Sequence, residues 1–314
     1  MNPQVSVVVP AYNRRRMLCD AIGSVLAQRG VALELIIVDD GSTDGTWEDL
    51  HHGQMAQNIA AGSCSDRGVL IERTPHRGPA GARNRGAALA SGGYLAFLDS
   101  DDLWAAQKLE RQLAYMRAHP EFPLSQTQEH WIRNGCRVNP GLRHKKRAGD
   151  IFEASLRTCL VSPSAVMMRT QLFHEMGGFD EAMAACEDYD LWLRISCRYR
   201  AGLLDEPLVT RRAGHPDQLS ATVPALDRFR IRALLKLLAG AELSVRQRFA
   251  VAEILAEKCA IHANGLLRRG RQDEFDFYSS LGQRARIMLD TRADHDAGGW
   301  SAALEIQPMD IAEA

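Results

Sequence analysis

Three groups of polar residues each follow a short apolar run in the first third of the chain. They are Pro10-Ala11-Tyr12-Asn13, Asp39-Asp40-Gly41-Ser42 and Asp99-Ser100-Asp101-Asp102. Clustered carboxylates supply the oxygen ligands that Mg²⁺ and Mn²⁺ prefer, and these ions in turn hold substrate phosphates. An acidic loop on its own is more often an ordinary turn or a helix N-cap. The three groups together favour a metal-assisted phosphate site.

Other motifs with similar chemistry can be excluded by their neighbouring residues. The segment Gly81–Gly86 has the glycine spacing of a P-loop, but Ala87-Ala88 stands where Lys and Ser or Thr would hold phosphate and magnesium. The segment Asp99–Glu110 imitates a calcium loop, but Leu103-Trp104 occupies a ligand position and the turn glycine. No G-x-G-x-x-G follows the first apolar run, which removes the main support for a dinucleotide site.

The apolar runs themselves are predicted to be strands of a parallel sheet. Over the first hundred residues, β-branched runs alternate with stretches of helical period, which is typical of strands joined by crossover helices. Ligands of such open α/β sheets bind outside the carboxyl ends of the strands, where all three polar groups lie. We expect strands at Val5–Val9, Leu33–Val38, Gly68–Glu72 and Tyr94–Leu98, and helices at Arg15–Gln28, Asp44–Gln57 and Gly81–Ala90.

The middle of the chain is less regular. A helix is predicted near Gln107–His119, and the segment Pro120–Ile151 is predicted to be irregular. Its basic run, Arg143–Arg147, is either a solvated loop or a lid that contacts an acceptor. A further strand and two helices are expected beyond it, at Ser164–Arg169, Gln171–Met176 and Asp188–Tyr199.

From Ala225 onward the pattern is helical and rich in leucine. Such an apolar stripe needs a partner surface, so these helices should dock on the preceding domain or form an oligomer contact. We therefore expect an α/β domain over residues 1–222 and a helical extension over residues 223–314.

Composition excludes several classes of protein. The 314 residues include 46% apolar and 25% charged residues, which is typical of a globular chain. Lys and Arg total 38 against 39 Asp and Glu, so no general positive field for nucleic acid exists. Seven cysteines without a C-x-x-C pair favour a reducing compartment. No apolar run approaches a membrane span, so we expect a cytoplasmic protein, located either free or at the inner face of the membrane.

Taken in order along the chain, the motifs closely resemble family 2 glycosyltransferases of the GT-A fold. The resemblance covers roughly residues 4–220 and implies transfer of a sugar from a nucleotide diphosphate donor with inversion of the anomeric carbon. The segments that carry it are Val5–Asn13, Ile36–Asp44, Gly81–Asn84, Phe97–Asp102, Gly177–Asp180 and Glu187–Arg194.

The resemblance implies a role for each matching residue of the donor site. Tyr12 would stack on the nucleotide base and Asp40 would accept a hydrogen bond from it, while Pro10 and Asn13 shape the same pocket. Further donor contacts would come from Asp39, which supports the turn or the ribose side, from Arg73, whose alternative is a surface ion pair, and from Arg83 and Arg212.

The resemblance also implies a metal site and a catalytic base. Asp99 and Asp101 would form a D-x-D element, in which Asp99 touches ribose and Asp101 coordinates Mn²⁺ or Mg²⁺. Asp102 is either a supporting partner or, as we prefer, the N-cap of the next helix. His215 would contact phosphate or metal.

The pair Glu187-Asp188 would open a helix, where acidic residues are favoured in any case. In the family the Asp of this pair deprotonates the acceptor hydroxyl, so Asp188 is the expected base. Glu187 would support it or orient the acceptor.

The predicted function is thus an inverting, metal-dependent glycosyltransferase of GT-A fold. Its donor would be a UDP- or dTDP-sugar, and its acceptor a hydroxyl on a glycan or a lipid-linked molecule. One alternative is a sugar-nucleotide nucleotidyltransferase, which would need a glycine-rich basic loop in place of Pro10–Asn13. Another is a nucleotide-binding protein that kept the fold without turnover.

Overall fold

The computed structural model describes residues 2–62, 68–141, 144–214 and 223–290. These residues belong to two compact units. The first unit holds Met1–Ile151, Leu160–Ala182 and Tyr199–Gln218, and the second holds Phe152–Cys159, Met183–Arg198 and Leu219–Ala314. Two inner segments that precede residue 222 therefore belong to the same unit as the C-terminal helices.

The first unit is built on a mixed sheet. Among the described residues, nine strands pair in the order β3-β2-β1-β4-β8-β6-β9-β5, with β7 added to β6. The strand order reverses between β1 and β4, which is the kind of switch point where α/β sheets bind ligands. Four strands are parallel, as predicted: β1 (Val5–Ala11), β2 (Leu33–Asp39), β3 (Gly68–Arg73) and β4 (Tyr94–Phe97).

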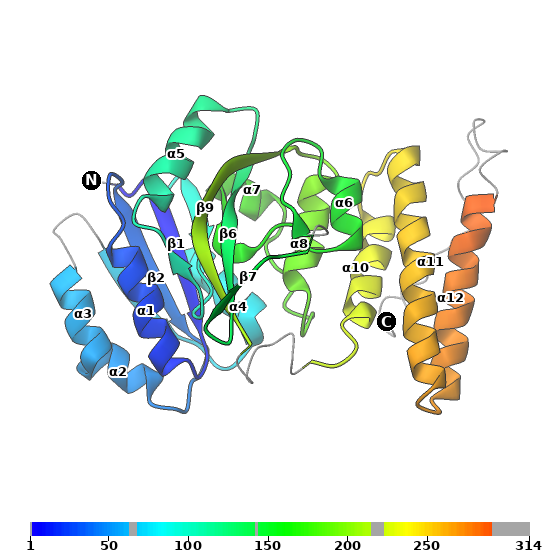
Figure 1. The fold of residues 1–314 in the computed structure, drawn as a ribbon, viewed down its shortest axis with the longest axis horizontal. Coiled ribbons are helices and arrows are strands. Elements are labelled where there is room, and N and C mark those ends of the chain that lie inside the picture. The colour runs from blue at the N-terminus through cyan, green and yellow to red at the C-terminus, as the bar shows by residue number, and fades with distance from the viewer. Residues whose placement is uncertain (1, 63–67, 142–143, 215–222, 291–314) are drawn as a thin grey trace. The chain divides into compact units, whose positions relative to one another are not determined.

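Helices cover both faces of the parallel strands (Figure 1). Val7 of β1 shares a buried cluster with Leu18 and Ile22 of α1 (Arg15–Leu26). The neighbouring Val8 points to the other face, because successive side chains of a strand alternate. There α4 (Gly78–Leu89) approaches so closely that a Cβ on Gly86 would lie 2.3 Å from a methyl group of Val8. The loop after β1 leads into α1 and the loop after β3 leads into α4, so both loops end in helices that pack on the sheet.

The other half of the sheet corrects the prediction for Pro120–Ile151. This segment contains β6 (Leu124–Arg133) and β7 (Cys136–Val138), an antiparallel hairpin turned by Asn134 and Gly135. Both turn residues have positive φ, 51° and 78°, which is the conformation of a type I′ turn. The remaining strands are β8 (Val166–Arg169), which was predicted, and β5 (Leu103–Trp104) and β9 (Ala201–Ala213), which were not.

The helices follow the predictions except that one is divided and one, α6 (Phe152–Arg157), was not predicted. The helix expected over residues 44–57 is two helices, α2 (Thr46–His52) and α3 (Gln54–Gly62), because Gly53 between them adopts an extended backbone. Within three residues of their predicted ends lie α5 (Lys108–Ala118), α7 (Thr170–Glu175) and α8 (Glu187–Ser196).

The second unit is helical, as expected for the C-terminal part of the chain. The helices α11 (Val245–Leu267) and α12 (Gln272–Asp290) run side by side (Figure 1), and Ser244 begins α11 with a capping box to Gln247. The leucines of α10 (Asp227–Gly240) share one buried core with α8 and with α6 (Phe152–Arg157). The predicted apolar stripe is therefore covered within this unit. None of the described helices is long and apolar enough to span a bilayer.

Candidate functional site

The loops after β1 and β2 are joined by direct hydrogen bonds. The amide of Asn13 donates to Ser42 Oγ at 2.9 Å, and the amide of Thr43 donates to Asn13 Oδ1 at 2.8 Å. Asn13 reaches this position with a φ of 52°, a conformation that Asn tolerates better than most residues. Pro10 is not in this loop, because β1 continues to Ala11 and pairs Pro10 with Val38. Its missing N–H costs little there, since the pairing of β1 with β4 ends at Val8.

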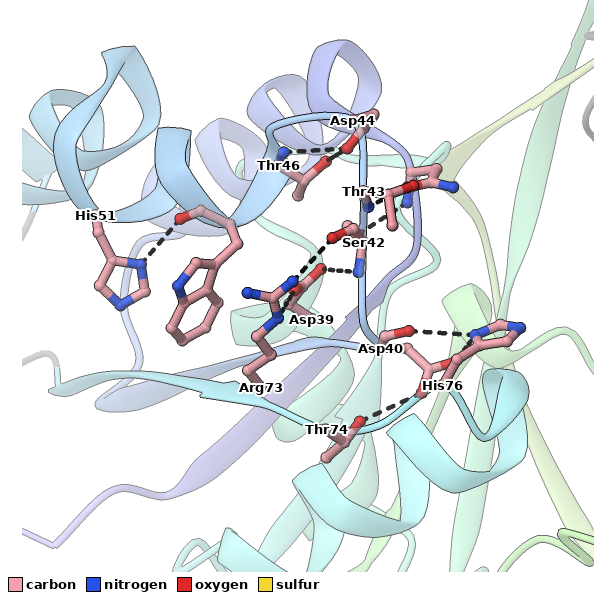
Figure 2. Close-up of polar contacts among 12 residues, drawn as sticks. Asp39, Asp40, Ser42, Thr43, Asp44, Thr46, His51, Arg73, Thr74 and His76 are labelled. Atoms are coloured by element: carbon pink, nitrogen blue, oxygen red, sulfur yellow. Dashed lines mark hydrogen bonds and ion pairs between the residues drawn. The ribbon is translucent and has the colours of Figure 1, made fainter.

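Asp40 follows β2 and organises the start of α4. Its side chain is buried, and Oδ1 accepts hydrogen bonds from Thr74 Oγ1 at 3.2 Å and from the amide of Arg77 at 2.8 Å. Oδ2 accepts from the amide of Gly78 at 2.8 Å. The nitrogen Nδ1 of His76 lies 2.8 Å from the same oxygen and 3.2 Å from the Asp40 carbonyl oxygen (Figure 2). The predicted contact between Asp40 and a base stays a prediction.

Tyr12 is exposed at the carboxyl end of β1, with 42% of its surface accessible. Its ring stacks on the imidazole of His76, with a centroid distance of 3.9 Å and an interplanar angle of 21°. Strands β1, β2 and β3 thus bring Tyr12, Asp40 and His76 together at one edge of the sheet. No pattern in the sequence singled out His76.

Asp39 and Arg73 close the ends of β2 and β3. Asp39 is fully buried, and its Oδ1 accepts a hydrogen bond from the amide of Ser42 at 3.2 Å, so it supports the turn. Arg73 places Nε 3.3 Å from Asp39 Oδ2, and its Nη2 donates to the Ser42 carbonyl at 2.9 Å (Figure 2). Its guanidinium also lies over the ring of Trp47. The ion-pair alternative for Arg73 is thus present in the structure.

Three carboxylates follow β4. Oxygens of Asp99, Asp101 and Asp102 all lie within 4.8 Å of one another. Asp102 is buried, which raises the pKa of its carboxyl well above the usual value, and the nearby charges of Asp101 and Asp99 raise it further. Asp102 accepts hydrogen bonds from Ser164 Oγ at 2.6 Å and from the amide of Arg212 at 3.0 Å. A cation would relieve the repulsion among these charges.

The prediction that Asp102 caps the next helix is wrong. The helix α5 begins at Lys108 with Gln107 at its N-cap. Asp102 is instead the buried member of the Asp99–Asp102 loop (the acidic loop). The hydroxyl oxygen of Ser164 also accepts a hydrogen bond from the amide of Asp99 at 3.1 Å, so Ser164 holds this loop at two points. Ser164 is therefore a residue of the site that the sequence analysis missed.

The Gly81–Asn84 motif contacts both the acidic loop and a later motif. Arg83 is buried, and its Nη2 lies 2.6 Å from Asp99 Oδ1. Asn84 donates to the Phe179 carbonyl at 2.8 Å and accepts the Phe179 amide at 2.9 Å. Gly178 has a φ of 70°, and a Cβ there would lie 2.7 Å from Asn84 Oδ1. These contacts fix the Gly177–Asp180 segment beside α4.

Arg212, at the end of β9, braces the acidic loop rather than projecting from it. Its guanidinium donates to the carbonyl of Asp101, to Asp20 Oδ2 at 2.7 Å and to the Met17 carbonyl at 3.3 Å. Its predicted contact with a diphosphate stays a prediction. The other basic candidate of this segment, His215, lies outside the described residues.

Several known proteins are similar to this chain in sequence or in fold. A family model described as glycosyl transferase family 2 matches residues 6–175, which is more than half of the chain. The chain belongs to this family. An uncharacterized glycosyltransferase of Rickettsia conorii is 34% identical over 205 residues. The match covers 65% of this chain and 32% of that protein, so the chain spans about a third of the length of that relative.

A second relative and a solved structure are also similar to this chain. WfaP of Escherichia coli, named UDP-Glc:alpha-D-GlcNAc-diphosphoundecaprenol beta-1,3-glucosyltransferase, is 29% identical over 192 residues, which are 61% of this chain and 69% of WfaP. The crystal structure of S. aureus TarS 1-349 in complex with UDP has a TM-score of 0.68 at 21% identity and covers 91% of this chain and 87% of that one. The chain therefore has the predicted GT-A fold.

The two acidic residues predicted for catalysis begin α8, in the second unit. Glu187 is buried and Asp188 is half-buried. Asp188 Oδ1 accepts the amide of Tyr189 at 2.7 Å, and the thiol of Cys159 donates to Oδ2 at 3.5 Å. Asp190 pairs instead with Arg194 and Lys236, which is a structural role.

Proposed function

We propose that this family 2 glycosyltransferase moves a sugar from a UDP- or dTDP-sugar to a hydroxyl of a glycan or lipid-linked acceptor and inverts the anomeric carbon. The observation that carries the proposal is the meeting of Tyr12, Asp40 and the Asp99–Asp102 loop at the carboxyl ends of β1, β2 and β4. WfaP supports the choice of substrates, because its name specifies a UDP-Glc donor and a diphosphoundecaprenol-linked acceptor. We propose that the reaction takes place in the cytoplasm, with the protein either free or at the inner face of the membrane.

The acidic loop fits a divalent metal. Its donor set consists of carboxylate oxygens, which suit Mg²⁺ and Mn²⁺, and one of its members is buried among like charges. Asp101 and Asp99 would hold the ion, and the ion would supply positive charge for the departing diphosphate. Ser164 and Arg212 keep the loop in place beneath and beside these carboxylates.

The donor would be positioned by the neighbouring loops. Tyr12 offers an exposed aromatic ring on which a base can stack. Arg83 holds Asp99 at 2.6 Å, which fixes the direction of a carboxylate that would face the ribose. Arg73, anchored on Asp39, would lie near the base or the phosphates.

Asp188 would remove the proton of the acceptor hydroxyl as the sugar is transferred. Asp188 is half-buried and lies in the first turn of α8, where the helix dipole favours negative charge. In-line attack from the side opposite the leaving diphosphate inverts the anomeric carbon. Glu187, buried next to it, would orient the acceptor.

The Asp188→Asn variant tests this assignment, because it keeps the size of the side chain but removes its basicity. Turnover of UDP-glucose with a diphospholipid-linked GlcNAc acceptor should fall by about 10²–10⁴-fold, whereas UDP affinity stays within a few-fold. Asp205→Asn, an exposed substitution on β9, serves as the matched control. Near-parental turnover of Asp188→Asn, or a product that retains the donor's anomeric configuration by proton NMR, would contradict the mechanism.

A further inference from the structure

The imidazole of His76 makes three contacts with two residues of the proposed donor site, one of them between Nδ1 and the Asp40 carbonyl oxygen at 3.2 Å. It stacks on the ring of Tyr12 at a centroid distance of 3.9 Å. Its Nδ1 lies 2.8 Å from Oδ2 of Asp40. Because an ionised carboxylate only accepts hydrogen bonds, this nitrogen must carry a proton. His76 therefore presents a flat aromatic ring and an N–H group to the same two residues that would receive a nucleobase.

Asp40 has no capacity left for a further donor in this arrangement. An ionised carboxylate offers about four acceptor positions. Thr74 Oγ1 and the amide of Arg77 approach Oδ1, while the amide of Gly78 and Nδ1 of His76 approach Oδ2. A base that pairs with Asp40 must replace one of these four donors.

Of the two side-chain donors, Thr74 and His76, only His76 also rests on Tyr12, so its departure alone frees both places that a base would occupy. Two of the other three are backbone amides at the start of α4, and moving them would disturb that helix. The side chain of His76, in contrast, is 53% exposed, so it can rotate into solvent. The same rotation uncovers the face of Tyr12 on which the imidazole rests.

We propose that His76 occupies the place of the nucleobase on Tyr12 and Asp40, and that it leaves when a base with its own ring N–H, such as uracil or thymine, binds. This inference rests on the proposed donor site. His76 then sets donor affinity, because the apparent dissociation constant is the intrinsic one divided by the fraction of molecules whose site is open.

The expected effect of removing the imidazole is a gain of affinity. An aromatic pair and one exposed hydrogen bond together favour the occupied state by roughly tenfold, which corresponds to about 1.4 kcal/mol. The His76→Ala variant should therefore bind UDP and uridine about tenfold more tightly than the parent. Its affinity for pyrophosphate, which has no base, should not change.

Calorimetric titrations at one fixed Mg²⁺ concentration test this expectation. The matched control is His51→Ala. The ring of His51 lies 4.0 Å from that of Trp47, measured between centroids, which is a similar histidine–aromatic pair, but His51 does not contact Asp40 (Figure 2). It should bind all three ligands as the parent does. His76→Gln keeps a hydrogen-bond donor but not the ring, so it should gain less affinity than His76→Ala.

Unchanged or weaker uridine binding by a folded His76→Ala protein would overturn the proposal, because His76 would then be absent from the base site or part of it. An equal gain for pyrophosphate would also overturn it, since the effect would act through charge. A different result would show that the proposed donor site itself is wrong. In that case Tyr12→Ala would bind UDP as tightly as the parent, whatever His76→Ala does.

Discussion

A buried ion pair beneath the hairpin of β6 and β7 offers a sharp test of how the first unit is held together. Nζ of Lys146 lies 2.9 Å from Oε1 of Glu129, and both side chains are at least 95% buried. Trp131 Nε1 donates to the other carboxylate oxygen at 3.0 Å. The substitution Lys146→Met removes the cation, keeps most of the side-chain volume and leaves Glu129 buried without its closest counter-charge.

The cost can be worked out in two ways. Burial alone would raise the pKa of Glu129, but the charges of Lys146 and Arg211 lower it from 4.5 to about 2. At 1.36 kcal/mol per pKa unit, that fall corresponds to about 3 kcal/mol of stability at neutral pH. Breaking a buried pair by removing one partner typically costs about 3–5 kcal/mol. Because part of the first figure comes from Arg211, which the substitution leaves in place, the second figure sets the expectation that Lys146→Met lowers the free energy of unfolding by about 3 kcal/mol.

Urea unfolding followed by tryptophan fluorescence measures this loss. Lys145→Met, at an exposed neighbouring lysine, is the matched control and should change stability by less than about 0.5 kcal/mol.

The difference in stability between the parent and Lys146→Met should also depend on pH, in a direction set by the pKa shift of Glu129. Because the folded pKa of Glu129 is depressed, its stabilisation is present above pH 4.5 and is lost as the pH falls toward 2. The difference between parent and Lys146→Met should therefore shrink over that range. A loss below 1 kcal/mol at pH 7, or a difference that does not change with pH, would refute the reasoning.

Two further substitutions probe the donor loops. Tyr12→Ala should weaken UDP binding by about 1–3 kcal/mol in calorimetry, because one stacking surface is lost, while the far-ultraviolet circular dichroism stays parental. Asn84→Ala leaves the buried amide and carbonyl of Phe179 without their partner, so the free energy of unfolding should fall by about 1–3 kcal/mol in urea titrations. Parental UDP affinity in the first case, or parental stability in the second, would show that these contacts do not act as described.

Three strands of the parallel half, β1, β2 and β4, were predictable as apolar runs that are largely buried in the structure, whereas β3, at the edge of the sheet, is partly exposed. Val5–Val9 and Leu33–Val38 could be recognised without any knowledge of their partners. The polar groups at the ends of these strands were predictable for the same reason, since topology alone brings them to one edge.

The hairpin of β6 and β7 was missed because its strand is polar. Gln126, Thr127 and Glu129 interrupt any apolar alternation, and what compensates their burial lies far along the chain. Glu129, for example, is paired with Lys146. The dipeptide Asn134-Gly135 was a usable local signal for the turn.

Within the site, the residues that the sequence analysis missed or misplaced are those whose roles depend on distant partners. Asp102 looks like a helix cap in sequence. Its actual role depends on the hydrogen bond from Ser164, 62 residues later, which holds its carboxylate in the interior. His76 follows no period or motif and takes its meaning from Tyr12 and Asp40, which follow two other strands. Such contacts are set by packing of loops and cannot be read from spacing.

The central claim is that the acidic loop binds a nucleoside diphosphate through a metal held by Asp101. The most direct measurement is the affinity of UDP by calorimetry, for the parent and for Asp101→Ala, each with Mn²⁺ and with a chelator. Mn²⁺ should strengthen UDP binding to the parent, and Asp101→Ala should lose this gain, because the carboxylate that would hold the ion is absent. Equal affinities in all four titrations would contradict it.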